Sequence, residues 1–180
     1  MNLSLLQENL NLALGHVSRF VSSKNQLPVL NNILFSTDQG RLKLSATNLE
    51  LSINYWIGAK IDQEGSITIP SKEITEFVSY LPSGKLDLEL KNNLITLSSE
   101  KNQSTFNTLP PTDFPEFPQI NPETEFDISV DLLTQAISQI SFSAATDDTR
   151  PVLTGILCSF NQEFIRFVST DGFRLSFKEI

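Results

Sequence analysis

The first twenty residues carry two hydrophobic periods in succession. Leu3 and Leu5 alternate with polar residues, which is typical of a strand with one buried face. Hydrophobic residues then recur every three or four positions, at Leu10, Ala13, Leu14, Val17 and Val21. Polar residues, among them His16 and Arg19, occupy the opposite face. The pattern predicts a short strand followed by an amphipathic helix.

Segments of alternating polarity, separated by turn residues, continue to about residue 109. After Pro28 they predict strands at Asn31–Thr37, Arg41–Ala46 and Glu50–Ile57. The series then returns as a strand at Ser66–Ile69, a helix with Ser71 as its N-cap, and strands at Lys85–Leu90, Leu94–Ser98 and Ser104–Leu109. Asn92-Asn93 joins two of these strands and is a good type I′ turn sequence. Residues 1–109 therefore indicate two β-α-β-β-β units.

Five prolines between Pro110 and Pro122, with Phe114 and Phe117 among them, predict an extended connector whose rings are pinned to a neighbouring surface. A further β-α-β-β-β unit begins near Glu125. It is predicted to hold a strand at Asp127–Val130, a helical stripe at Leu133, Ala136, Ile137 and Ile140, and strands near Thr154–Phe160, Glu163–Ser169 and Arg174–Lys178. We therefore predict an N-terminal domain over residues 1–118, a connector over 119–124, and half of a second domain over 125–180.

The chain also repeats itself at an offset of 123 positions. Pro28-Val29-Leu30 then falls on Pro151-Val152-Leu153, and Thr47 falls on Thr170, without any gap. A period of this size is that of a duplicated domain rather than of a solenoid repeat. Because the offset places the counterparts of Gly58–Pro118 beyond Ile180, we expect the chain to be truncated.

Composition and charge exclude fewer classes of function than the hydrophobic pattern does. The formal charge of −8 argues against simple wrapping by nucleic acid, although an average does not exclude a local basic surface. Met1–Leu6 lacks the basic start of a signal peptide, and no apolar run is long enough to cross a membrane, so we expect a cytoplasmic protein. Cys158 is the single cysteine and occupies the repeat position of Phe35, which predicts a small core residue.

The sequence shows no constellation of residues for catalysis. Sequences typical of phosphate-binding loops, nucleophile elbows and zinc sites are absent, and His16 is the only histidine. Asp147, Asp148 and Asp171 could hold Mg²⁺, but acidic pairs in loops are more typical of turns. Thr170-Asp171-Gly172 and its repeat partner Thr47-Asn48-Leu49 both predict a turn capped by side chains. We therefore predict a protein without catalytic residues, metal or cofactor.

Four motifs occur together, in order, along this duplicated framework. They are Leu27-Pro28-Val29-Leu30, Ala46-Thr47-Asn48-Leu49-Glu50-Leu51, Thr108-Leu109-Pro110 with Asp113-Phe114-Pro115, and Thr170-Asp171-Gly172-Phe173-Arg174-Leu175. With them the chain resembles the bacterial sliding clamps, the beta subunits of DNA polymerase III, over an N-terminal domain and half of a central domain.

The resemblance implies an α+β DNA-clamp fold, with helices on one face of antiparallel sheets. It implies a head-to-tail homodimer that closes into a ring, with helices lining the hole and strands forming the outer wall. Such a ring encircles double-stranded DNA without reading its sequence and tethers the replicative polymerase. The clamp itself would be a non-catalytic accessory subunit of the DNA-directed DNA polymerase, a nucleotidyltransferase complex.

Two sites are implied by the resemblance. For DNA contact it points first to Lys24, which aligns with a basic position that the family uses, and then to Arg19 and Lys72; ordinary solvated charges explain these residues equally well. For partner proteins it implies one wall of a pocket that takes a short linear motif from the polymerase III alpha subunit, the clamp loader and repair proteins. That wall matches Leu153, Thr170, Gly172, Phe173, Arg174 and Leu175, with Arg150 nearby.

The residue types suit peptide binding. Leu153 and Leu175 offer apolar area, Gly172 lets a ligand backbone approach, and Arg174 can bond peptide carbonyls. The family often has histidine where this chain has Phe173, so the preferred peptide is expected to differ. Because the opposite wall is expected beyond Ile180, we expect these residues alone to bind such a peptide weakly or not at all.

Two other functions stay open at this point. The chain could be a stand-alone clamp-like interaction module or adaptor that forms no ring. It could also be a small-molecule enzyme using Asp171 and Arg174, which would require a closed polar cavity and a base that the sequence does not show.

Overall fold

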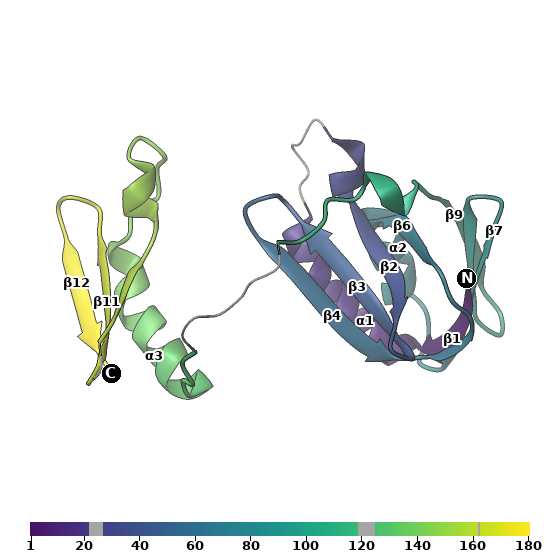
Figure 1. The fold of residues 1–180 in the computed structure, drawn as a ribbon, viewed down its shortest axis with the longest axis horizontal. Coiled ribbons are helices and arrows are strands. Elements are labelled where there is room, and N and C mark those ends of the chain that lie inside the picture. The colour runs from purple at the N-terminus through teal and green to yellow at the C-terminus, as the bar shows by residue number, and fades with distance from the viewer. Residues whose placement is uncertain (22–26, 119–124, 162) are drawn as a thin grey trace. The chain divides into compact units, whose positions relative to one another are not determined.

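The computed structural model describes residues 1–21, 27–118, 125–161 and 163–180, which form two compact units, Met1–Gln119 and Ile120–Ile180 (Figure 1). Lys24 and the predicted connector at 119–124 lie outside the described residues. Each unit combines antiparallel strands with helices, which confirms the predicted α+β class. Within the described residues, no helix is both long and apolar enough to cross a membrane.

The first unit contains two antiparallel sheets. One has five strands in the order β5-β1-β7-β8-β9, and the other has four in the order β4-β3-β2-β6. The strands are β1 (Asn2–Leu6), β2 (Asn32–Asp38), β3 (Arg41–Thr47), β4 (Ser52–Gly58), β5 (Lys60–Gln63), β6 (Ser66–Pro70), β7 (Lys85–Lys91), β8 (Leu94–Ser98) and β9 (Gln103–Asn107). Two α-helices, α1 (Gln7–Val17) and α2 (Ser71–Ser79), pack against each other and against these sheets, with short 3-10 turns η1 (Ser18–Phe20), η2 (Pro28–Asn31) and η3 (Pro111–Asp113).

The hydrophobic stripes predicted from the sequence form the core of this unit. Four of the stripe residues on α1 have no exposed surface: Leu10, Ala13, Leu14 and Val17. They pack with Ile74 and Val78 of α2 and with the inward residues of both sheets, such as Leu42 and Leu88. A fully buried leucine contributes about 1.5–3 kcal/mol, so this shared core holds helices and sheets together.

Two local predictions need correction in the first unit. Strand β5 was not predicted, because Ile61 is the only apolar residue between Lys60 and Gln63; pairing with β1, where Leu3 lies opposite Ile61, forms it instead. Ser71 is not the N-cap of α2 but its first residue. Pro70 takes the cap position while still pairing with Asn32 in β2, so the strand runs directly into the helix without a side-chain cap.

The turn between β7 and β8 agrees with its sequence. Asn92 and Asn93 have φ angles of 50° and 60°. Positive φ at both central residues is the requirement of a type I′ hairpin turn, which asparagine tolerates better than most residues. The predicted turn is therefore confirmed.

The described part of the second unit has one α-helix on one face of a three-stranded sheet. Helix α3 (Val130–Ile140) packs against β11 (Ile165–Thr170) and β12 (Leu175–Glu179), and β10 (Leu157–Phe160) completes the order β10-β11-β12. The 3-10 turns are η4 (Ser141–Ser143) and η5 (Pro151–Thr154). Ala136, Ile140 and Phe167 form a small buried core, and the Ser169 hydroxyl donates a hydrogen bond to the Ile140 carbonyl.

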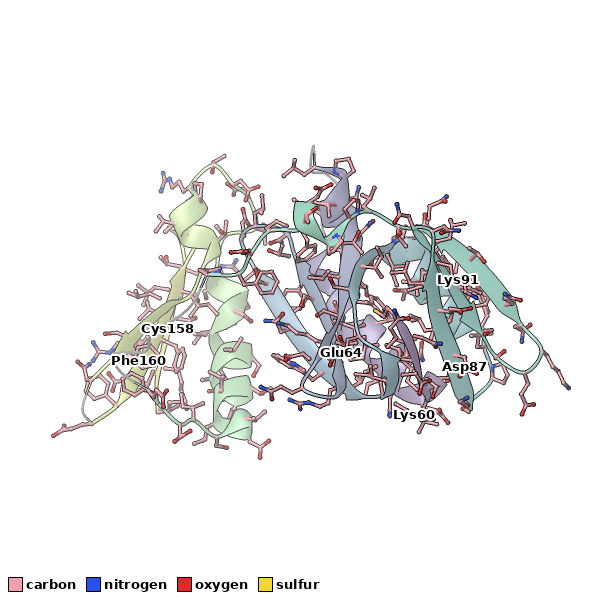
Figure 2. All side chains as sticks on the ribbon, turned by 45° about the vertical axis from the view of Figure 1, so that its right-hand side comes forward. Lys60, Glu64, Asp87, Lys91, Cys158 and Phe160 are labelled. Atoms are coloured by element: carbon pink, nitrogen blue, oxygen red, sulfur yellow. The ribbon has the colours of Figure 1, made fainter. Side chains whose placement is uncertain are left out.

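Three predictions for this unit are wrong for one physical reason. No strand forms at Asp127–Val130, Ile137 on α3 is 40% exposed although its counterpart Leu14 is fully buried, and Cys158 is exposed although Phe35 is fully buried (Figure 2). In the first unit β1 lies between β5 and β7, and α1 packs against α2. The described part of the second unit has no counterparts of these partners, so a similar sequence pattern stays unpaired and exposed.

Candidate functional site

The turn between β3 and β4 is built by two side chains. Thr47 Oγ1 accepts a hydrogen bond from the Leu49 amide at 3.0 Å and donates one to the Leu51 carbonyl at 3.0 Å. Asn48 Oδ1 accepts from the Glu50 amide at 3.0 Å and from the Leu51 amide at 2.7 Å. Hydroxyl and amide oxygens thus satisfy the backbone groups that a sharp turn leaves without partners.

The turn between β11 and β12 repeats this arrangement. Thr170 Oγ1 accepts from the Gly172 amide at 3.1 Å and donates to the Arg174 carbonyl. Asp171 Oδ1 takes the role of Asn48, accepting from the Phe173 amide at 2.9 Å and from the Arg174 amide at 2.7 Å. The predicted side-chain-capped turn is therefore confirmed in both copies.

The third turn position needs a left-handed backbone in both copies. Leu49 has a φ of 75° and Gly172 a φ of 90°. A leucine is strained there and a glycine is not, so the backbone conformation already accounts for Gly172. A Cβ added to Gly172 would lie 3.5 Å from Nη1 of Arg150, an ordinary contact. The Arg150 side chain therefore lies in the space beside this glycine.

Charge distinguishes the second turn from the first. The Arg174 and Phe173 amides and then the Arg174 guanidinium lower the pKa of Asp171 to about 2. Arg174 reaches the second carboxylate oxygen through Nε at 3.0 Å and Nη2 at 2.9 Å. Arg174 is thus held by its own turn, and Asp171 is too weak a base to serve the enzyme alternative at neutral pH.

A hollow of about 310 Å³ lies against this turn. It brings together four of the predicted peptide-pocket residues, Arg150, Leu153, Gly172 and Phe173, with Asp171, Ala145, Asp147 and Thr149 as additional lining. The other three predicted residues do not line it. Thr170 uses its hydroxyl in the turn, Arg174 is paired with Asp171, and Leu175 lies opposite Thr170 in the sheet.

Asp147 and Thr149 were not predicted as pocket lining. The Thr149 hydroxyl donates to Asp147 Oδ1, and the Thr149 amide donates to the same oxygen at 3.1 Å. These two bonds, and then the positive charge of Arg150, lower the pKa of Asp147. An Asp-x-Thr spacing is the signal for such a local turn. In the part of the chain that the structure describes, no group of three potential ligands could hold a metal ion.

An exposed apolar strip lies on the outer face of the three-stranded sheet. Leu157, Val168 and Phe177 are direct cross-strand neighbours, and Leu175 is on the same face of β12. Leu157, Leu175 and Phe177 are each about two-thirds exposed, at 65%, 66% and 64%, and Phe173 is 98% exposed. Apolar side chains gathered in this way mark a binding surface or an interface. The register that aligns Leu157 with Phe177 is not visible in the sequence.

Two of the three predicted DNA-contact residues lie among the described residues, and both are exposed. Arg19 is on η1 and Lys72 is on α2, two neighbouring elements, while Lys24 lies outside the described residues. Lys72 lines a hollow of about 650 Å³ together with Glu73 and Glu76. His16 is exposed and stacks on Tyr55, with ring centroids 5.6 Å apart. The structure gives Arg19 and Lys72 no ion-pair partner among the described residues.

Comparison with known proteins gives matches over nearly the whole chain. A model of the DNA polymerase III beta subunit N-terminal domain matches residues 1–118, and a model of its central domain matches residues 127–180. The chain is 33% identical to the beta sliding clamp of Synechococcus elongatus, with 98% of the chain covering 48% of that protein. It is 34% identical to the beta sliding clamp of Synechocystis, covering 99% of the chain and 48% of that protein.

Solved structures of sliding clamps have the same fold as this chain. The DNA polymerase sliding clamp of Bacillus subtilis has a TM-score of 0.95 at 27% identity, and the DNA polymerase III subunit beta of Pseudomonas aeruginosa has 0.94 at 28%. In both comparisons all of this chain covers 50% of the other. The chain thus spans about half the length of the relatives it matches.

Proposed function

The chain belongs to the family of bacterial sliding clamps, the beta subunits of DNA polymerase III, and from this membership we propose that the protein containing it is a processivity factor for DNA replication. The observation that carries the proposal is the succession of an N-terminal and a central clamp domain, matched in order along residues 1–118 and 127–180. The protein would encircle duplex DNA and tether the replicative polymerase to its template.

The mechanism is topological. Two copies of the whole protein join head to tail as a ring, and a duplex inside a closed ring cannot leave it by dissociation alone. Helices α1 and α2 would line the hole, because they pack against each other and carry the exposed polar residues His16 and Lys72. A net charge of −8 is compatible with this function, because linkage rather than charge retains the DNA.

DNA contacts in this scheme are few and directed at phosphates. Sliding requires that no base sequence be read, so contacts from Lys24, Arg19 and Lys72 would be loose and solvated. The two glutamates beside Lys72 keep the local potential low and limit its contribution.

The partner site is proposed on the second unit. A linear motif from the polymerase III alpha subunit, the clamp loader or a repair protein would place its apolar side chains against the hollow and the apolar strip. Leu153, Phe173 and Leu175 provide the apolar contacts, Thr170 and Gly172 hold the turn, and Arg150 and Arg174 border it. Because Arg174 is occupied by Asp171, Arg150 is the better donor for a peptide carbonyl.

The protein is proposed to act without a catalytic residue, metal or cofactor, as a cytoplasmic accessory subunit of the polymerase. The acidic residues that could serve an enzyme support this. Asp147 and Asp171 each accept hydrogen bonds from their own turns, which stabilise the charged form and leave neither suited to proton transfer at neutral pH.

The test uses topology. The labelled whole protein is loaded by its clamp loader onto nicked circular DNA and separated by gel filtration in about 0.5 M salt, where contacts between exposed charges are screened. We expect it to stay with the circle and to leave when a restriction enzyme linearises the DNA. Equal retention on circular and linear DNA would contradict linkage. Absence of retention together with intact motif-peptide binding would favour an adaptor that forms no ring.

A further inference from the structure

The single tryptophan of the chain lies on the surface between two cations. Trp56 on β4 is 39% exposed, with Nζ of Lys43 5.5 Å and Cζ of Arg41 5.9 Å from its ring centroid. All three are on the outer face of the four-stranded sheet, since the alternate residues Leu42 and Leu44 are fully buried on the side of the helices. We name Arg41, Lys43 and Trp56 the outer patch.

The second unit has different residues at the three equivalent positions. At the repeat offset Arg41, Lys43 and Trp56 correspond to Phe164, Arg166 and Glu179. The register is the same, because Lys43 pairs with Trp56 across β3 and β4 as Arg166 pairs with Glu179 across β11 and β12. In the second unit the cation is neutralised: Arg166 donates to Glu179 through Nε at 2.7 Å and stacks on Phe164.

The outer patch lacks that carboxylate. Tryptophan stands where the second unit has glutamate, and a second cation stands where it has phenylalanine. Among the described residues neither Arg41 nor Lys43 has an ion pair within 4.0 Å. Asp38 pairs with Arg41 across β2 and β3, and it accepts the indole N–H of Trp56 at 2.7 Å. The outer patch therefore offers two positive charges and fixes its aromatic ring.

The outer patch continues into a hollow. Lys43 also lines a cavity of about 660 Å³ between the sheet and the segment Pro111–Pro118. Its floor holds the hydroxyls of Ser36 and Ser66, its wall holds Phe117, and Glu116 is its one acidic lining residue. A hollow of this size accommodates several side chains of an extended peptide.

We propose that the outer patch and this hollow form a docking surface for an acidic, extended segment of a partner protein. Carboxylates of the segment would pair with Arg41 and Lys43, as Glu179 pairs with Arg166 in the second unit. An apolar residue of the segment would cover the Trp56 ring. Tryptophan and arginine are the residues that most often dominate binding energy at protein interfaces, and cations held over an aromatic ring are already ordered for binding.

A protein partner fits this face better than nucleic acid does. The outer patch is on the side of the sheet away from α1, which packs against β3 and β4 from the other side (Figure 1). The hollow contains Glu116, which would repel the continuous charge of a phosphate backbone, whereas a peptide can place an uncharged residue there and its carboxylates beside Arg41 and Lys43. The surface is separate from the motif-binding site proposed on the second unit and does not depend on the proposed function.

The test uses Trp56 itself, the only indole in the chain, as the reporter. Its fluorescence is titrated with an eight-residue peptide alternating glutamate and leucine, and with the counterpart that has lysine for glutamate. We expect saturable binding of the acidic peptide that weakens with salt, and no response to the lysine peptide. The double variant Arg41→Ala, Lys43→Ala should raise the dissociation constant about five- to thirtyfold, the loss of two partly exposed charge pairs.

A matched control removes the same charge elsewhere. The double variant Lys60→Ala, Lys91→Ala changes two exposed lysines of the other sheet and should alter the constant less than twofold (Figure 2). Equal weakening by both double variants, or no response to the acidic peptide up to about 1 mM, overturns the proposal. A 20-base-pair duplex that binds through Arg41 and Lys43 would assign the face to DNA, and self-association lost in the same variant would assign it to a second copy; either overturns the proposal.

Discussion

The turn between β3 and β4 and the turn between β11 and β12 have the same hydrogen bonds but different side chains. A threonine and an asparagine or aspartate close each turn, and the third residue is left-handed in both. From this third residue onward, three side chains differ. The first copy has Leu49-Glu50-Leu51, and the second has Gly172-Phe173-Arg174. The shared residues build a turn, and the unshared ones determine what the turn presents to a partner.

The largest predicted difference between the copies is at Phe35 and at its counterpart Cys158. Phe35→Ala should lower the free energy of unfolding by about 3–5 kcal/mol, because it empties a fully buried site. The equivalent change Cys158→Ala should alter it by less than about 0.5 kcal/mol, because that position is exposed. Urea unfolding followed by Trp56 fluorescence for Phe35, and by circular dichroism for Cys158, measures both. A large loss for Cys158→Ala would show that this position is buried.

The left-handed position should respond with opposite signs. Gly172→Ala introduces a side chain at a φ of 90° and should destabilise the second unit by about 1–2 kcal/mol. Leu49→Gly removes strain at a φ of 75° but increases the freedom of the unfolded chain, so the net gain should be below about 1 kcal/mol. Thermal unfolding of the two variants compares them. Stabilisation by Gly172→Ala would mean that the two turns do not share a backbone.

The smallest effect concerns the ion pair between Asp171 and Arg174, which the first turn lacks. The pKa of Asp171 is lowered from 3.8 to about 2 by the Arg174 and Phe173 amides and by the Arg174 side chain. Because the pKa is lower in the folded state, its stabilisation is present above pH 3.8 and is lost as the pH falls towards 2. A carboxyl NMR titration should give a midpoint near 2 for Asp171. A midpoint near 3.8 would mean that the turn does not hold the carboxylate.

Asp171→Asn provides the matched control for this charge. It creates in the second turn the side chain that Asn48 supplies in the first, so the two backbone hydrogen bonds are retained and only the ion pair with Arg174 is lost. The variant should remain folded, and its stability should no longer change between about pH 4 and pH 2 through this residue.

Local pattern predicted most of the fold. Stripes such as Leu10 to Val17 predicted the helices, and alternating polarity predicted every described strand except β5. The failures all depend on partners distant in sequence: β5 exists because β1 pairs with it, and Asp127–Val130 is not a strand because no described segment pairs with it. Burial of Cys158 likewise required a second helix that its own segment does not encode.

The candidate site could be predicted only in part for the same reason. The Thr-Asp-Gly turn carries its own signal, whereas the pocket residues Gly172 and Phe173 were expected from the resemblance to sliding clamps; both line the same hollow as Leu153. The pairing of Arg174 with Asp171 could not be predicted, because it depends on the side-chain geometry of the folded turn. The strip formed by Leu157 and Phe177 depends on strand register across β11, which no local pattern specifies.

The central claim is that the unshared residues of the second turn bind the partner. The most direct measurement is the affinity of the whole protein for a labelled clamp-binding peptide from the polymerase III alpha subunit, before and after Gly172→Leu, Phe173→Glu and Arg174→Leu together. These changes install the side chains of the first turn, which keeps the same hydrogen bonds although Leu49 is strained at a φ of 75°. We predict unchanged DNA retention and a loss of peptide affinity of more than about tenfold, or about 1.4 kcal/mol. An affinity within about twofold of the original would contradict the account.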